Sequence, residues 1–295
     1  MTYPESDKLN KHSAQKITVY EPNQRARIGW FRTWGIMVRN IVDSWELIIQ
    51  LFKRDFLMSY KKSFLGMSWL IITPLMGIIS WVFMNATGIL SPGDVGIPYP
   101  AYVLLSTSIY GLFMSFYSGA AGTLDAGRGF ISQVKFAHDA LLVKQFLQQL
   151  ANFLISFILT IIVLLAFRVV PSWMIILFPI MIIPMMLLGA GIGLISSVIS
   201  VVATDIQKGI AFIMGLLMYV TPVIYSDKVN DPLLQTIIKW NPLTYLIGAV
   251  RDAMLYGRVE HLDRFLLASG LSLLFFLVTW RLFYISEEKV IEKMI

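Results

Sequence analysis

The sequence predicts an all-α integral membrane protein with six transmembrane helices, an N-terminal amphipathic interface helix and a re-entrant external helical hairpin before the last span. Its 295 residues are 57% hydrophobic and only 14% charged, whereas soluble domains are about half apolar and about a quarter charged. The mean hydropathy is +0.70, and the apolar residues come in long runs, as lipid-embedded helices require. The chain has no cysteine, so disulfides and thiolate metal sites are excluded.

Six apolar runs define the expected spans. A helix needs about 20 residues to cross the hydrocarbon, and five of the runs are long enough. The run at 209–225 is short and has Pro222 near its end. It can still span if its outer end is buried in protein, where broken helices are tolerated. We therefore expect spans at 67–87, 100–122, 146–168, 174–200, 209–225 and 262–284.

The segment before the first span divides into two parts. Residues 1–29 are polar, and residues 1–39 are expected to form a cytosolic extension, without a signal peptide, because the first strongly apolar run starts near Gly66. Residues 40–65 place apolar side chains at three- and four-residue spacing beside lysines and arginines, the pattern of a helix in the membrane interface. The alternative is an ordinary soluble helix packed on a domain.

The distribution of positive charge predicts the orientation. Most of the 24 lysines and arginines fall on one side if both termini are cytosolic, which follows the positive-inside rule and an even number of spans. We therefore expect a multi-pass inner-membrane protein. Its transmembrane domain covers 66–285, with a cytosolic loop at 123–145 and a cytosolic tail at 286–295.

The stretch at 228–258 contains two short amphipathic segments separated by Asn241 and Pro242. Each is too short to cross a membrane. A helical hairpin that dips back into the membrane from outside is acceptable where it faces protein or water, and we favour it over a folded external loop.

No enzyme signature is present. His12, His138 and His261 lie far apart and suggest no metal site, so neither a metal nor a cofactor is expected on this chain. The nearest approach to a phosphate loop, at 122–130, lacks the required lysine. If ATP provides the energy for transport, ATP and Mg must therefore bind a partner subunit. The spans contain almost no ionisable residue, which argues against a secondary carrier. A membrane enzyme acting on lipid-linked sugars would need clustered Asp, Glu or His.

Uncharged polar and aromatic side chains remain as candidates for a channel. Gln145, Gln148, Gln149 and Asn152 form one stripe, either as links between helices or as a cavity lining. Gly189 and Gly193 indicate close helix packing. Aromatic residues are usually interface anchors or packing, but some could form a wall on which sugar rings slide. The candidate glycan-channel residues are Trp81, Phe83, Tyr110, Phe113, Phe116, Tyr117, Tyr219, Gln145 and Gln149.

Three segments carry specific motifs: RDFLMSYKKSFLGMSWLIITPL at 54–75, TDIQKGIAFIMGLLMYVTPVIY at 204–225 and NPLTYLIGAVRDAMLYG at 241–257. Together they resemble type-2 ABC transporter permeases of the polysaccharide export family. The first is similar to the family's entry motif, the second to its penultimate span and the third to its external segment. VYEPNQ at 19–24 is similar to the N-terminal extension of the O-antigen exporters.

The resemblance implies a homodimer that works with two nucleotide-binding ATPase subunits. The loop between the second and third spans would carry the helix that couples to the ATPase, although this chain has Ala137 where many relatives have proline. The external segment would close the channel mouth, with Asn241, Pro242 and Arg251 as gate candidates. The candidate coupling residues are Gln133, Lys135, Phe136, His138 and Asp139.

These patterns lead to one hypothesis of function, export of a polyprenyl-diphosphate-linked polysaccharide of O-antigen type from cytosol to periplasm. Arg54, Lys61 and Lys62 are placed to bind the diphosphate, although anchoring to anionic lipid explains them equally well. Capsule, teichoic acid or another lipid-linked cargo is the nearest alternative. A membrane enzyme acting on lipid-linked sugars is the alternative of a different class. No nucleic-acid partner is expected.

Overall fold

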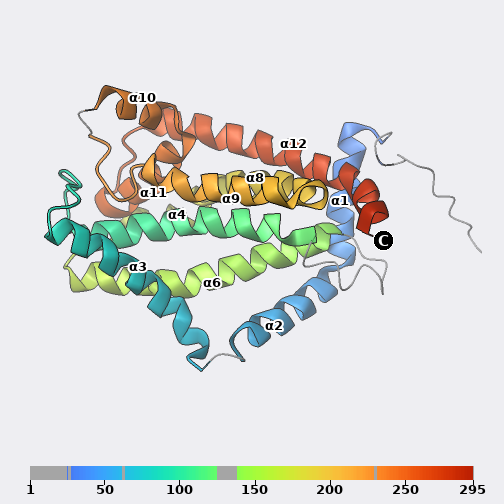
Figure 1. Ribbon diagram of the computed structural model, residues 1–295, viewed down its shortest axis with the longest axis horizontal. Helices are drawn as coiled ribbons and strands as arrows, with labels where there is room; N and C mark the ends of the chain where they lie inside the picture. Colours follow the sequence, from blue (N-terminus) through green and yellow to red (C-terminus); the bar gives the residue numbers. More distant parts are fainter. Residues whose placement is uncertain (1–24, 26–27, 62–63, 125–137, 229–230, 295) are drawn as a thin grey trace, which may run out of the picture.

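The computed structural model describes residues 25, 28–61, 64–124, 138–228 and 231–294. Within these ranges the regular structure is helical, and no strand occurs (Figure 1). The α-helices are α1 Trp30–Asp43, α2 Trp45–Lys61, α3 Trp69–Ala86, α4 Tyr99–Ala121, α6 His138–Ala166, α7 Phe178–Met181, α8 Ile183–Val202, α9 Thr204–Leu216, α10 Pro232–Trp240, α11 Pro242–Tyr256 and α12 Leu262–Met294. Short 3-10 turns precede or follow several of them: η2 Gly66–Ser68, η3 Trp173–Leu177 and η4 Leu217–Tyr219.

Five helical stretches in the described part of the chain have the length and the apolar composition to cross a membrane. They correspond to five of the six expected spans, with the largest shift at α6, which begins at His138 rather than at 146. Their bounds are Gly66–Ala86, Tyr99–Ala121, Asp139–Ala166, Trp173–Val202 and Leu262–Ser286.

The helix expected at 209–225 is shorter than predicted and begins earlier. It starts at Thr204, and after Leu216 only the 3-10 turn η4 continues it, as far as Tyr219. Pro222 prevents the helix from continuing through the predicted end at 225, because proline lacks an N–H donor and disfavours helical geometry at the residue before it. As a result, α9 is too short to count among the five spanning helices.

The core of the bundle is built around α4, which is buried along most of its length and packs against α8, α6 and α3. Close approach of α8 depends on Gly189 and Gly193. A Cβ on Gly189 would lie 2.5 Å from the carbonyl oxygen of Phe113, and a Cβ on Gly193 would lie 2.7 Å from the Cβ of Ala120. The predicted glycine-mediated packing is therefore confirmed.

Most of the segment expected as an amphipathic helix at 40–65 is α2, and a separate helix, α1, begins within the expected extension at 1–39. Helix α1 begins at Trp30 and ends at Asp43, and α2 begins at Trp45. Both pack against α6. In Figure 1, α1 crosses the end of the bundle where α12 finishes, and α2 leads from there toward the start of α3.

The first and last described parts of the chain meet at one end of the bundle, which we call the terminal end. Arg25 donates to the carbonyl oxygen of Tyr284 at 3.1 Å, and the rings of Trp34 and Trp280 make an edge contact at 5.5 Å. The opposite end, here the distal end, carries α10 and the loop before α4 (Figure 1). From α3 to α12 the described part of the chain contains the five long helical stretches, with the short α9 between the last two of them.

Candidate functional site

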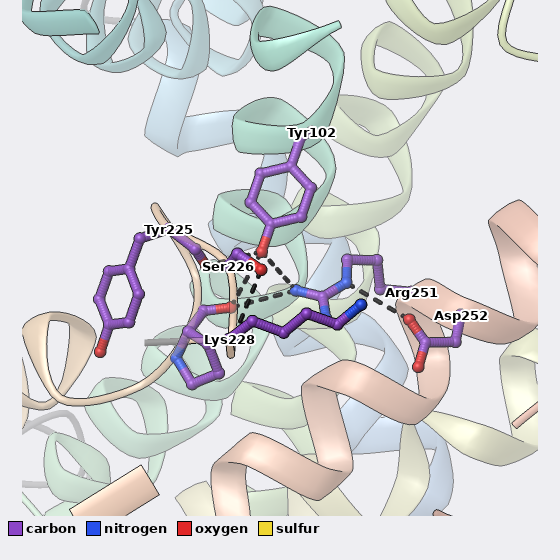
Figure 2. Close-up of polar contacts among 7 residues, drawn as sticks. Tyr102, Tyr225, Ser226, Lys228, Arg251 and Asp252 are labelled. Carbon is purple, nitrogen blue, oxygen red and sulfur yellow. Dashed lines mark hydrogen bonds and ion pairs between the residues drawn. The ribbon is translucent and has the colours of Figure 1, made fainter. Parts of the chain in front are cut away.

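The segment that follows α9 is held at the distal end by a buried arginine. Arg251 of α11 is 7% exposed. Its Nη1 donates to the hydroxyl of Tyr102 at 2.7 Å and to the carbonyl oxygen of Pro222 at 3.1 Å. Its Nε lies 3.5 Å from a carboxylate oxygen of Asp252 (Figure 2). One cation therefore links α11, α4 and the irregular segment.

Two tyrosines of α4, one turn apart, bind the same segment. The Tyr102 hydroxyl, which accepts from Arg251, donates to the carbonyl oxygen of Tyr225 at 2.8 Å. The Tyr99 hydroxyl donates to the carbonyl oxygen of Ile224 at 3.1 Å. Because both hydroxyls come from the core helix, they fix the segment to the most buried element of the bundle.

Asn241 completes this arrangement from the start of α11. Its Oδ1 accepts from the backbone N–H of Leu243 and caps the helix. Its Nδ2 donates to the hydroxyl of Thr221 at 2.8 Å and to the carbonyl oxygen of Val220. We call this arrangement the distal collar. It comprises residues 220–226 and the four side chains that bind them, Tyr99, Tyr102, Asn241 and Arg251.

The collar provides hydrogen-bond partners for the backbone of a buried, non-helical segment. Carbonyl groups outside a helix cost free energy when they are buried without hydrogen-bond partners, and the side chains of the collar supply those partners.

The charges of Arg251 and Asp252 balance each other locally. Burial raises the pKa of Asp252, and the Arg251 guanidinium opposes this only in part. Burial favours a neutral Arg251, but Tyr102 and the nearby aspartates outweigh it and raise the pKa of the guanidinium.

A second polar cluster ties the terminal end together. Asp139 at the start of α6 is 1% exposed. It accepts from the indole N–H of Trp280 at 3.0 Å and from the amide of Asn40 at 3.3 Å. This carboxylate therefore joins α1, α6 and α12.

An ion pair joins α2 to α6 one turn further along. The Nζ of Lys144 lies 2.8 Å from one oxygen of Asp55, and the guanidinium of Arg54 lies 2.8 Å from the other. Burial alone would raise the pKa of Asp55, but the hydrogen bonds and charges of Lys144 and Arg54 outweigh it and lower that pKa below its usual value. Sequence reasoning missed this pair, because nothing along the chain relates positions 55 and 144.

The predicted coupling and diphosphate residues are only partly described. Asp139 lies in the terminal cluster, and His138 begins α6. Arg54 is bound to Asp55, and Lys61 is exposed at the end of α2. The remaining four lie outside the described residues: Lys62, Gln133, Lys135 and Phe136.

The predicted channel aromatics fall into two groups. Four are buried inside this chain's own bundle: Tyr110, Phe113, Phe116 and Tyr117. Phe83 and Tyr219 are exposed, at 62% and 54%, and the ring of Trp81 lies 6.2 Å from that of Tyr219. Gln145 and Gln149 are half-buried on α6.

The gate candidates meet at the collar. Asn241 and Arg251 bind the same segment, and Pro242 occupies the first turn of α11. The sequence analysis did not single out Tyr99 or name Tyr102 as a site residue. Their three-residue spacing at the start of a span is the signal that could have drawn attention to them, whereas their position opposite Arg251 is visible only in the structure.

Comparison with known proteins gives one family and several relatives. Residues 46–255 match the family model described as ABC-2 type transporter. The O-antigen export system permease protein RfbA of Myxococcus xanthus is 24% identical over 72% of this chain and 81% of its own length. A Klebsiella pneumoniae protein with the same name is 21% identical over 76% and 86%. The polysialic acid transport protein KpsM of Escherichia coli is 20% identical over 71% and 81%.

Proposed function

Because this chain belongs to the ABC-2 type transporter family, we propose that it is the permease subunit of an ATP-driven exporter of lipid-linked polysaccharide. Proteins of this family form the membrane part of transporters, and the ATPase is a separate subunit. The observation on which the cargo proposal rests is the agreement among its relatives, which are named for export of O-antigen and for transport of polysialic acid.

The mechanism begins at the terminal end, on the cytosolic side. Two copies of the chain form a dimer, and two ATPase subunits dock on the loop before α6. Movement of that loop reaches α2 through the Lys144–Asp55 ion pair and reaches α12 through Asp139 and Trp280. The polyprenyl diphosphate of the cargo binds beside Arg54, Lys61 and Lys62, because charge-assisted hydrogen bonds to phosphate need cations at the interface.

The glycan then follows the dimer axis toward the periplasm. The exposed aromatic side chains Phe83 and Tyr219 and the half-buried Trp81, on α3 and just after α9, form its wall. The distal collar closes the outer mouth, with α10 and α11 as a hairpin that returns into the membrane from outside. Six spans, counting α9, place both termini in the cytosol, and the meeting of the first and last described parts of the chain at one end of the bundle supports this number.

Co-purification tests the assignment. A tagged chain, expressed with its neighbouring genes and purified from the inner membrane, is expected to retain a nucleotide-binding subunit and to hydrolyse ATP only together with it. The chain alone should have no ATPase activity. Robust hydrolysis by the chain alone, or export without any nucleotide-binding companion, would overturn the proposal.

The same complex tests the diphosphate site. Arg54→Gln combined with Lys61→Gln should reduce export and the stimulation of ATP hydrolysis by lipid-linked substrate. Arg39→Gln is the matched control, since Arg39 is an exposed cation of α1 paired only at the surface with Asp43. Equal export by both variants would assign these cations to lipid anchoring.

A capsule-type cargo is the second candidate, and the polysialic acid relative favours it specifically. Glycosyltransferase and polymerase genes next to the coding gene would distinguish O-antigen from capsule.

A further inference from the structure

A small polar cavity opens beside Arg251 at the distal end. Its volume is about 200 Å³, and it lies between the loop at 94–96, the segment at 226–228 and the residues around the end of α11. Its floor is buried, since Tyr102, Ser226 and Arg251 are 3%, 7% and 7% exposed. The exposed charged residues at its rim are Asp94, Asp227, Lys228, Arg258 and Glu260.

The floor has hydrogen-bonding capacity that the protein does not use. Arginine has five N–H donors. Those of Arg251 on Nη1 and Nε are engaged, whereas Nη2 has no acceptor among the described residues. The ammonium of Lys228 likewise makes no ion pair within the described part of the chain. In Figure 2, the side chains of Lys228, Arg251 and Asp252 point into the same region.

The charges around the cavity select the chemistry of its ligand. Four carboxylates and three cations line it, so a phosphate or another anion would meet net repulsion. An apolar ligand would leave these groups without partners, at a high cost in free energy. The described residues contain no group of three or more His, Asp or Glu side chains that could hold a metal ion. A neutral molecule with several hydroxyls fits, because each hydroxyl can donate to a carboxylate and accept from a cation.

The size of the cavity sets the size of the ligand. A volume of about 200 Å³ corresponds to roughly six or seven waters at about 30 Å³ each, and is below the ~300–1,000 Å³ of pockets for drug-sized ligands. The half-exposed ring of Tyr256 at the rim offers an apolar face to a sugar's C–H groups.

We propose that this cavity binds a single sugar residue of the exported polysaccharide as the chain leaves the distal end. The inference rests on the proposed function, because it takes the polysaccharide as the cargo. A sugar ring held between Asp227 and Glu260 links the emerging glycan directly to the distal collar, because Arg251 is part of the collar and also lines the cavity.

Protection of a single cysteine tests the inference, because the chain has none of its own. Val95→Cys places a thiol in the cavity wall without removing a polar group, and Ser91→Cys in the same loop but outside the lining is the matched control. The complex with its ATPase is labelled with a maleimide in the presence of methyl glycosides of common hexoses. A glycoside at twice its dissociation constant should slow labelling at position 95 about threefold and leave position 91 unchanged.

A second substitution tests whether a rim residue of the cavity binds the glycoside that protects the cysteine. Glu260→Gln should weaken glycoside binding about tenfold, through loss of a charge-assisted hydrogen bond. Asp263→Asn, three residues away and outside the lining, should have no effect. Absence of protection by every glycoside, protection by calcium chloride instead, or protection that survives Glu260→Gln would overturn the inference. If the cavity test fails but the complex still exports polysaccharide and hydrolyses ATP, only the sugar site is overturned and the proposed function stands. Absence of a co-purifying ATPase overturns the proposed function itself.

Discussion

Arg251 is the residue on which the distal collar depends most, because it is buried, charged and bonded to three elements. Its guanidinium compensates the carboxylate of Asp252 and satisfies the carbonyl of Pro222. Removal of one partner of a buried ion pair leaves the other charge uncompensated, which typically costs about 3–5 kcal/mol.

Arg251→Met is therefore expected to destabilise the protein by about 3 kcal/mol or more. The double variant Arg251→Met/Asp252→Asn should recover part of this loss, because it removes the uncompensated carboxylate. Thermal unfolding in detergent measures both effects. Arg264→Met is the control, since the Arg264–Asp263 pair is exposed and such pairs contribute about 0–1 kcal/mol. A double variant no more stable than the single one would contradict the proposed pairing.

Asp55 gives the terminal end a pH dependence. Its pKa in the folded protein is lowered by Lys144 and Arg54 despite partial burial. A carboxyl whose folded pKa is depressed stabilises the fold above its unfolded pKa, and this stability is lost as pH falls through the folded pKa. The contribution of Asp55 is therefore present at neutral pH and disappears below its ordinary value of 3.8.

Hydrogen exchange in α2 can follow this loss. In the wild type, exchange in α2 should rise as the pH falls below about 4, after correction for intrinsic rates. In Asp55→Asn it should already be raised at neutral pH and should change less on acidification. An α2 that exchanges equally in both proteins at neutral pH would show that the ion pair does not hold α2 against α6.

At the scale of the elements, the contact between α4 and α8 depends on two glycines rather than on large apolar side chains. The backbone of α8 at Gly189 and Gly193 lies against carbonyl oxygens of α4 at Phe113 and Tyr117. Close backbone approach is the usual way in which membrane helices associate, because lipid provides no hydrophobic driving force between them.

Gly193→Ala should consequently separate the two helices and lower the thermal unfolding midpoint, because the added Cβ meets backbone atoms that cannot move aside. Gly189→Ala should act in the same direction. Gly215→Ala in α9 is the matched control, since a Cβ there meets no atom within 4 Å. In an exposed helix, this replacement raises helix propensity by about 0.8–1.0 kcal/mol. If Gly193→Ala were as stable as Gly215→Ala, the close packing would not contribute to stability.

At the scale of the whole molecule, whether α9 crosses the membrane decides on which side of the membrane α10 lies. If α9 crosses with the aid of the collar, α10 lies on the same side as the loop before α4. If α9 does not cross, α10 would lie on the opposite side, away from the loop before α4 beside which the structure places it (Figure 1).

Single cysteines can distinguish these cases because the chain has no cysteine. An impermeant maleimide applied to intact spheroplasts should label Ser91→Cys and Gln235→Cys. It should label Arg39→Cys and Asp205→Cys only after the membrane is opened. These positions lie in the loop before α4, in α10, in α1 and at the start of α9. Protection of Gln235→Cys in intact spheroplasts would contradict a six-span topology.

Features that depend on residues close together along the chain were predicted better than features that depend on the tertiary structure. The five long spans follow from composition alone, because a run of about 20 apolar residues has few alternatives to a membrane helix. The extent of α9 could not be predicted, since hydropathy continues past Leu216 while the helix ends. The break at Ser44 between α1 and α2 was also missed, because the apolar periodicity continues across it. Asn241 and Arg251 were named as gate candidates from the sequence, but their shared target at Val220–Ser226 was not predicted.

By itself, the sequence determined the family, the all-helical membrane class, five of the spans and the glycines of the central contact, because each depends on residues close together along the chain. Only the tertiary structure decided which polar groups meet. Arg251 with Tyr102, Asp55 with Lys144, and Asp139 with Trp280 are each separated by dozens of positions. The physical reason is that a buried polar group must find a partner in the folded interior, and the folding of the whole bundle determines which group that is.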